Sequence, residues 1–216
     1  MALIAKADSN GSFTPVPTGL HLARCYRIID LGTQESEYMG VKKMLQKVML
    51  QFEVHSEDEN GNPTVTAKGE PLSISKNFTL SLGEKATLRN DLKTWRGRDF
   101  TPEELRGFEL KNVLGVWCTL SIIKAMGRDG TKEYTNISGI MPVSVQQRKA
   151  GLPNGFNEPK LYSIDEHDQA LFETFSDNLR AKIMASPEFK MKTGNTSFAA
   201  PASQVAANID DDDIPF

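Results

Sequence analysis

Residues 47–54, Lys-Val-Met-Leu-Gln-Phe-Glu-Val, carry a large apolar side chain at every second position. Val48, Leu50, Phe52 and Val54 fall on one face of an extended chain, and the intervening side chains fall on the other. A period of two residues is typical of a strand that buries one face. This stretch therefore predicts a β-strand.

The sequence on either side of this strand predicts more strands and one helical connection. The other predicted strands are 19–31, 72–82, 116–123 and 133–143. Residues 32–43 are predicted to be a connection, and Gly127–Gly130 a hairpin turn. Residues 84–95 have apolar side chains at helical spacing, and Thr101–Glu104 is a capping box with proline at the first helical position. The predicted order is three strands, a helical connection, and a hairpin.

A five-stranded OB barrel has this order, with its helix between the third and fourth strands. We therefore predict a mainly β protein with an OB-like barrel. Other small barrels remain open, because strand order alone does not specify this fold. OB-folds bind oligonucleotides across strands 2 and 3 and through the loops after strands 1 and 4.

The remainder of the chain is predicted to be appendages. Residues 165–184 predict one amphipathic C-terminal helix, and 193–209 are uncharged and rich in alanine, serine and asparagine, which is typical of a linker. The predicted organisation is a flexible arm (1–18), an OB-like domain (19–150), an extension with one helix (151–192), and a disordered linker with an acidic tail (193–216).

Composition narrows the class of protein. The chain has 216 residues and no apolar run near the ~20 residues of a membrane span. Two cysteines are too few for the disulfide framework of a secreted protein of this size, so we expect a reduced, cytoplasmic protein. The three histidines lie far from one another along the chain, and no cysteine and histidine spacing typical of a metal site is present. We therefore expect no metal, no cofactor and no catalytic residues.

Charge is distributed unevenly along the chain. Residues 1–150 have a net charge of +3, and residues 151–216 a net charge of −6, although the whole chain has only −3. The last seven residues begin with four consecutive aspartates, Asp210–Asp213. This asymmetry suggests an anionic ligand for the body and a separate role for the tail, unless the acidic end serves only solubility.

The chain ends with Asp210, Asp211, Asp212, Asp213, Ile214, Pro215 and Phe216. This ending resembles the C-terminal peptide of bacterial single-stranded DNA-binding proteins. Pro215 limits the conformations lost on docking, and Phe216 offers its ring and the α-carboxylate together. The resemblance implies that the tail recruits replication, recombination and repair proteins, of the host or of a phage.

A second resemblance lies in the body. Residues 88–105, LRNDLKTWRGRDFTPEEL, are similar to a segment that recurs in phage and prophage proteins. Together the two resemblances imply a phage-type single-stranded DNA-binding protein in the cytoplasm or nucleoid of a bacterial host. Such a protein protects single strands and is not an enzyme. The resemblance leaves open whether it forms a homo-oligomer.

Non-specific strand binding needs cations along the strand and aromatic rings for the bases. Trp117 is the strongest stacking candidate, because it shares its strand face with polar residues. Phe52, Phe78 and Trp95 are expected in the core. The candidate DNA-binding residues are Arg24, Tyr26, Arg27, Lys42, Lys43, Lys47, Lys76, Trp117, Lys124, Arg128, Lys132 and Tyr134.

Two alternatives remain open. The basic cluster Arg89, Lys93, Arg96 and Arg98 is expected to bind carboxylates such as Glu103 and Glu104, but phosphate or the acidic tail would also suit it. For the whole protein, the alternative to strand protection is a phage strand-annealing recombination protein, which would assemble into rings or filaments.

Overall fold

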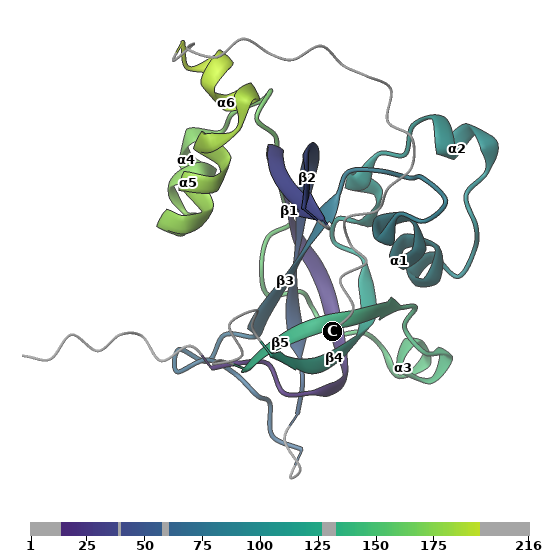
Figure 1. Cartoon of the computed structure of the whole chain (residues 1–216). Helices are drawn as coiled ribbons and strands as arrows, with labels where there is room; N and C mark the ends of the chain where they lie inside the picture. Colours follow the sequence, from purple (N-terminus) through teal and green to yellow (C-terminus); the bar gives the residue numbers. More distant parts are fainter. Residues whose placement is uncertain (1–13, 39, 58–60, 127–132, 195–216) are drawn as a thin grey trace, which may run out of the picture.

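The computed structural model describes residues 14–38, 40–57, 61–126 and 133–194. The fold is mainly β, as the alternating stretches predicted (Figure 1). The strands are β1 (Gly19–Tyr38), β2 (Val41–His55), β3 (Leu72–Thr79), β4 (Trp117–Met126), β5 (Glu133–Met141) and β6 (Lys160–Tyr162). The helices are α1 (Thr87–Arg96), α2 (Pro102–Arg106), the 3₁₀ turn η1 (Leu110–Val113), α3 (Val145–Ala150), α4 (Gln169–Glu173), α5 (Asp177–Ala185) and α6 (Pro187–Lys192).

The strands form one open sheet. Five of them pair antiparallel in the order β3-β2-β1-β4-β5, and the short β6 pairs parallel with β1. Within the described residues no backbone ladder joins β3 to β5, so the sheet is not the closed barrel that we predicted. None of the helices in the described ranges has the length and apolar character of a membrane span.

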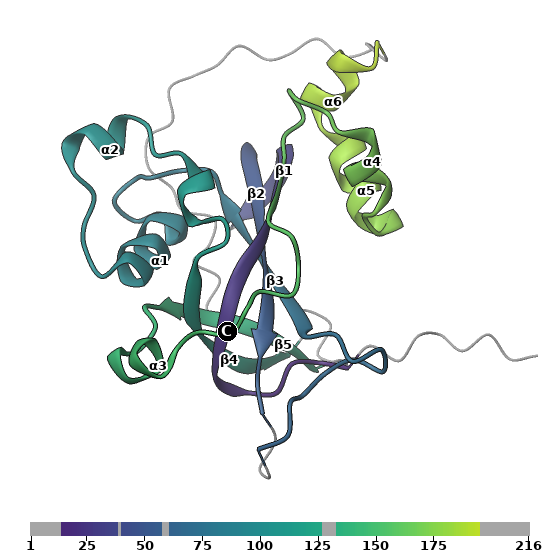
Figure 2. The same cartoon turned by 180° about the vertical axis from the view of Figure 1, so that it is seen from behind.

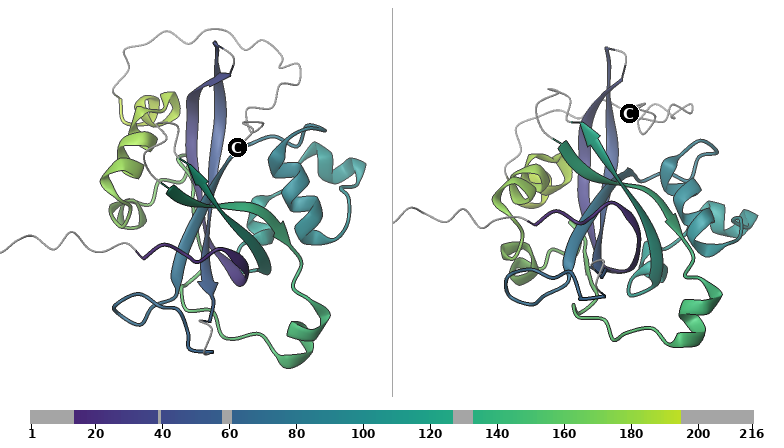
Figure 3. Two further views of the ribbon diagram at one scale, coloured as in Figure 1. Left: turned by 60° about the horizontal axis from the view of Figure 1, so that its bottom comes forward. Right: turned by 90° about the horizontal axis from the view of Figure 1, so that it is seen from below.

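β1 is the longest strand, and it contributes to two hydrophobic cores. The segment 32–43 was predicted to be a connection, but β1 and β2 continue through it as a hairpin that projects beyond the other strands (Figure 3). Register shifts after Cys25 and after Asp30 break the alternation of β1. As a result Cys25 and Ile28 pack in the first core, whereas Ile29 packs in the second.

The first core lies between the sheet and α1. Leu88, Leu92 and Trp95 are buried there, and the Trp95 ring lies 5.8 Å from that of Phe52. Trp95 is therefore a core residue, as predicted. Val16 is only 1% exposed in the same core, so the end of the segment predicted to be a flexible arm is packed. Residues 1–13 of that segment lie outside the described ranges.

The second core lies under the C-terminal helices. We predicted one helix over 165–184, but the chain forms three short helices, α4, α5 and α6 (Figures 1 and 2). The break has a local cause, because the Ser176 side chain accepts a hydrogen bond from the amide of Leu179 and starts a new helix. Ser186 caps α6 in the same way, with Pro187 in its first turn.

The extension is part of the body rather than an appendage. β6 pairs with β1, and α6 packs closely on β1 at Gly32. Gly32 has a φ of 66°, and a Cβ there would lie 2.5 Å from Cβ of Ser186, so no larger residue fits. The carboxylate of Glu188 accepts hydrogen bonds from the Thr33 amide and hydroxyl. Residues 151–192 therefore fix the position of β1.

Candidate functional site

Three of the predicted DNA-binding residues are engaged in packing. Lys76 lies on the core side of β3, where its Nζ is 2.8 Å from Oδ2 of Asp91 on α1. The Arg27 guanidinium packs over the rings of Tyr26 and Phe175. Tyr26 is 6% exposed, and burial raises the pKa of its hydroxyl. These side chains do not form an open surface for a nucleic acid.

The other predicted cations are divided between the β1–β2 hairpin and the β4–β5 hairpin. On the projecting hairpin, Lys42 forms an exposed ion pair with Glu35 and Lys47 donates a hydrogen bond to the Thr79 hydroxyl. On β4, Lys124 pairs with Glu133. The remaining candidates are Lys43, which is half-buried, Tyr134, which is exposed on β5, and Arg128 and Lys132, which lie outside the described residues. Among the described residues, these candidates do not line a common groove.

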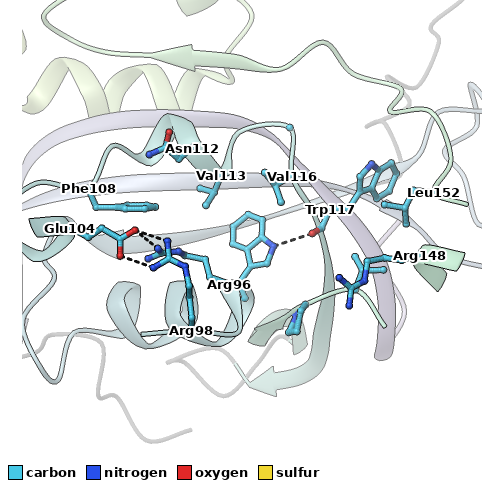
Figure 4. A pocket seen from close by; sticks show the side chains of 14 residues that line it. Arg96, Arg98, Glu104, Phe108, Asn112, Val113, Val116, Trp117, Arg148 and Leu152 are labelled. Carbon is cyan, nitrogen blue, oxygen red and sulfur yellow. Dashed lines mark hydrogen bonds and ion pairs between the residues drawn. The ribbon is translucent and has the colours of Figure 1, made fainter. Parts of the chain in front are cut away.

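A groove of about 730 Å³ lies elsewhere, between α1, α2, β4 and α3 (Figure 4). Trp117, Leu152 and Arg148 lie at one end, and the other end holds Phe108 and the polar cluster around Glu104. The charged side chains that line the groove are Arg96, Arg98, Arg148 and Glu104. The groove therefore combines aromatic and apolar walls with a net positive charge.

Trp117 is the predicted residue that this groove contains. It lies on the strand face opposite Cys118 and Leu120, which are buried in the first core. Its half-buried ring meets the His55 ring edge-on, with centroids 4.9 Å apart. Its carbonyl accepts a hydrogen bond from Nε1 of Trp95, which ties β4 to α1. The Trp117 ring therefore lines the groove, and the Trp117 backbone is held by Trp95 of the first core.

The other end of the groove is organised by Glu104. This carboxylate accepts hydrogen bonds from Arg98 and Arg96, as the sequence predicted, and from the Thr101 amide in the capping box. The Arg98 bond, the Thr101 amide and Arg96 together lower the pKa of Glu104 to about 2. Arg96 also packs over Phe108, 4.8 Å from the ring centroid. Its buried Nη1 has no hydrogen-bond partner among the described residues.

The rest of the basic cluster binds another carboxylate. Lys93 lies 2.6 Å and Arg89 lies 3.9 Å from oxygens of Asp99. Arg148 differs from all these cations, because the described residues place no hydrogen-bond acceptor on its guanidinium. It is the cation in the groove that a ligand reaches without breaking an ion pair.

Sequence reasoning missed one network next to the groove. Glu53 is fully buried on the sheet face opposite the first core, where it accepts hydrogen bonds from Arg24, His55, the Phe156 amide, and the Asn157 amide and side chain. Burial alone would raise the pKa of Glu53, but the bonds from His55, Asn157 and Phe156 outweigh it and lower the pKa to about 2. Arg24, a predicted DNA contact, is therefore a structural residue.

Neither of the two comparisons with known proteins found a match, whether to protein-family models or to curated proteins. Among the described residues, no group of three or more histidine, cysteine, aspartate or glutamate side chains is arranged to hold a metal ion. Both cysteines are buried, and burial raises the pKa of Cys25 to about 12. The groove with Trp117 is thus the feature on which a function is best built.

Proposed function

We propose that this protein binds single-stranded DNA without sequence specificity. The observation that supports this most directly is that one groove holds the Trp117 ring and the Arg148 guanidinium, which has no ion-pair partner among the described residues. An aromatic ring stacks on any base, and a guanidinium binds the phosphates that every strand carries. Sequence readout instead needs several side chains aimed at base edges, whereas Arg96 and Arg98 are bound to Glu104, and Asn112 is the single amide side chain among the residues that line the groove.

The proposal includes an OB-type arrangement of the sheet, opened between β3 and β5. Its support is the strand order β3-β2-β1-β4-β5 together with the helical connection between β3 and β4. In this arrangement the groove lies beside β4 rather than on the face of β2 and β3. Residues 155–157 contact that face at Glu53, which favours the groove as the path of the strand.

Paired arginine and lysine variants test the site. Arg148→Gln should weaken binding to an oligothymidylate and reduce the slope of log K against log salt by roughly 0.7, the share of one phosphate contact on a single strand. Lys149→Gln is the matched control, because Lys149 is the next residue of α3, is also exposed, and does not line the groove. Equal effects of the two variants contradict the site.

Tryptophan variants test the stacking. Trp117→Ala should weaken binding by about 1–3 kcal/mol. The Trp95→Phe variant keeps Trp117 as its single tryptophan, and its fluorescence should change when the oligonucleotide is added. In Trp117→Phe the remaining tryptophan is Trp95, which lines the groove but is only 4% exposed, so its fluorescence should change less. Equal affinity of the native protein for duplex and single strands would contradict the whole proposal.

We propose further that residues 210–216, which lie outside the described ranges, recruit genome-maintenance proteins. The support is the sequence of the tail, in which four aspartates are followed by Ile214, Pro215 and Phe216. Removal of Phe216 alone should abolish binding to proteins that read the bacterial tail, and should leave strand binding intact. If partner affinity in a titration is unchanged, the acidic end is only a solubility tail.

A further inference from the structure

Phe156 is an exposed aromatic ring on a loop whose backbone is firmly held. The residue is 57% exposed, although Phe is one of the side chains most often buried. Its amide donates a hydrogen bond of 3.0 Å to Oε1 of Glu53. The next residue, Asn157, donates two bonds of 2.7 Å to Oε2 of the same carboxylate. The ring therefore stands on a fixed backbone.

The neighbouring residues fix this loop as well. The Asn157 carbonyl accepts a hydrogen bond of 3.1 Å from Nη1 of Arg24. Gly155 lies directly against the same guanidinium, and a Cβ at that position would lie 1.4 Å from Nη1. A side chain at position 155 would have to displace the Arg24 guanidinium, which Glu53 and the Gly115 and Asn157 carbonyls hold in place.

The network that holds Phe156 also reaches Trp117. Arg24 pairs with Trp117 across β1 and β4, and its Nε donates to the Gly115 carbonyl two residues before Trp117. His55 contacts both Glu53 and Trp117. Its Nε2 lies 3.4 Å from Oε1 of Glu53, and its ring meets the Trp117 ring edge-on. Thus Arg24, Glu53 and His55 connect the loop of Phe156 to the wall of the groove.

We propose that Phe156 is a second stacking platform, which binds a base of the same single strand that passes Trp117. This inference rests on the proposed function, and it adds a binding residue from the C-terminal extension, where no strand or barrel loop of the predicted OB site lies. The occupant follows from the network of Arg24, Glu53 and His55, which joins this loop to Trp117 in the groove that supplies the cations for the phosphates. A pre-ordered ring also loses little conformational entropy when a base stacks on it.

The buried Glu53 fits this role. A carboxylate without solvent exposure is costly unless fixed donors surround it, and three of its donors are groups of Phe156 and Asn157. The loop is thereby held at a buried charge, while its largest apolar side chain points to solvent. Packing of the fold does not explain that exposure, but stacking of an incoming base does.

Substitutions at Phe156 test the proposal against an oligothymidylate, with fluorescence anisotropy as the readout. Phe156→Ala should weaken binding roughly 5- to 100-fold, the loss expected for one stacked base. Phe156→Trp should retain the affinity, whereas Phe156→Leu, which is apolar without a ring, should behave like alanine. Leu161→Ala is the matched control, because Leu161 is exposed on β6 in the same extension and should have no effect.

The outcomes separate this inference from the proposed function. If the native protein binds the oligonucleotide and Phe156→Ala binds equally well, the platform is wrong and the proposed function stands. If the native protein does not bind single strands at all, the proposed function fails. Phe156→Ala should not alter the thermal unfolding midpoint, since the ring is exposed. If it instead changes the sedimentation coefficient and not the DNA affinity, the ring belongs to a contact between copies and the proposal is overturned.

Discussion

Two glutamates on either side of Trp117 have the same pKa and different surroundings. Glu53 and Glu104 each bind arginine, and the pKa of each is lowered to about 2. Glu53 has no exposed side-chain surface, and it is bound by backbone and side-chain donors from three segments of the chain. The side chain of Glu104 is 24% exposed, and its ion-pair partners, Arg96 and Arg98, belong to the groove itself.

The difference shows that a pKa does not measure what a carboxylate contributes to the fold. Around Glu53 the donors replace water, so loss of the carboxylate leaves several buried groups without a partner. Around Glu104 water and salt compete with the arginines, and the same bonds contribute little to stability. Glu53 therefore determines structure, whereas Glu104 determines how much positive charge the groove presents to a ligand.

The largest expected effect comes from Glu53→Ala. It should lower the free energy of unfolding by about 3–5 kcal/mol, because Arg24 and the donors of residues 156 and 157 lose their common acceptor. Urea unfolding measures this, and Glu57→Ala, an exposed glutamate just beyond β2, is the control. A loss below about 1 kcal/mol would mean that the bonds of Glu53, like those of Glu104, contribute little to stability.

Acid should remove the contribution of Glu53 in a defined window. Its folded pKa of about 2 lies below its ordinary value of 4.5, so the stabilisation is complete above pH 4.5 and is lost as the pH falls towards 2. The native protein and Glu53→Gln should therefore differ most near neutral pH, and their unfolding free energies should converge in this window. A difference that stays constant from neutral pH to pH 2 would show that the charge of Glu53 is not what stabilises the loop.

Much of the fold was predictable because a buried face leaves a periodic signal. β2, β3 and β4 alternate since one side of each packs in the first core. The far end of the β1–β2 hairpin escaped prediction for the opposite reason. Residues 33–37 and 40–46 bury no continuous face, and the two strands are held there by backbone pairing to each other, so no apolar period marks them as strands.

The candidate site was predictable only in part. Alternation placed Trp117 on the face away from the core, and the capping box fixed Glu104 beside the arginines. The same alternation contained a signal that was not used for Lys76, since it shares its face with Ile74 and Phe78 and so points towards α1. The Glu53 network had no local signal, because its donors Phe156 and Asn157 lie about a hundred residues further along the chain.

A smaller effect is expected from Glu104→Gln. Stability should change little, because water and salt compete with surface ion pairs. Single-strand binding should become tighter at low salt, with the log K slope steeper by roughly 0.7, because an arginine becomes available to a phosphate. Glu103→Gln removes the same charge from the same helix outside the groove, and is the control. Weaker binding in Glu104→Gln alone would mean that Glu104 positions the arginines for the ligand.

The smallest expected effect is that of Lys76→Met on DNA binding. The Lys76 ammonium lies 2.8 Å from Asp91 and over the Phe78 ring, on the side of β3 that faces α1. A phosphate on the far face of the sheet meets only its screened charge, which decays within about 8 Å at physiological salt. The affinity and the salt slope should therefore match those of the native protein, whereas Arg148→Gln changes both. If Lys76→Met reduces the slope by roughly 0.7, as one lost phosphate contact would, the strand reaches β3 from the helix side and the groove is only part of its path.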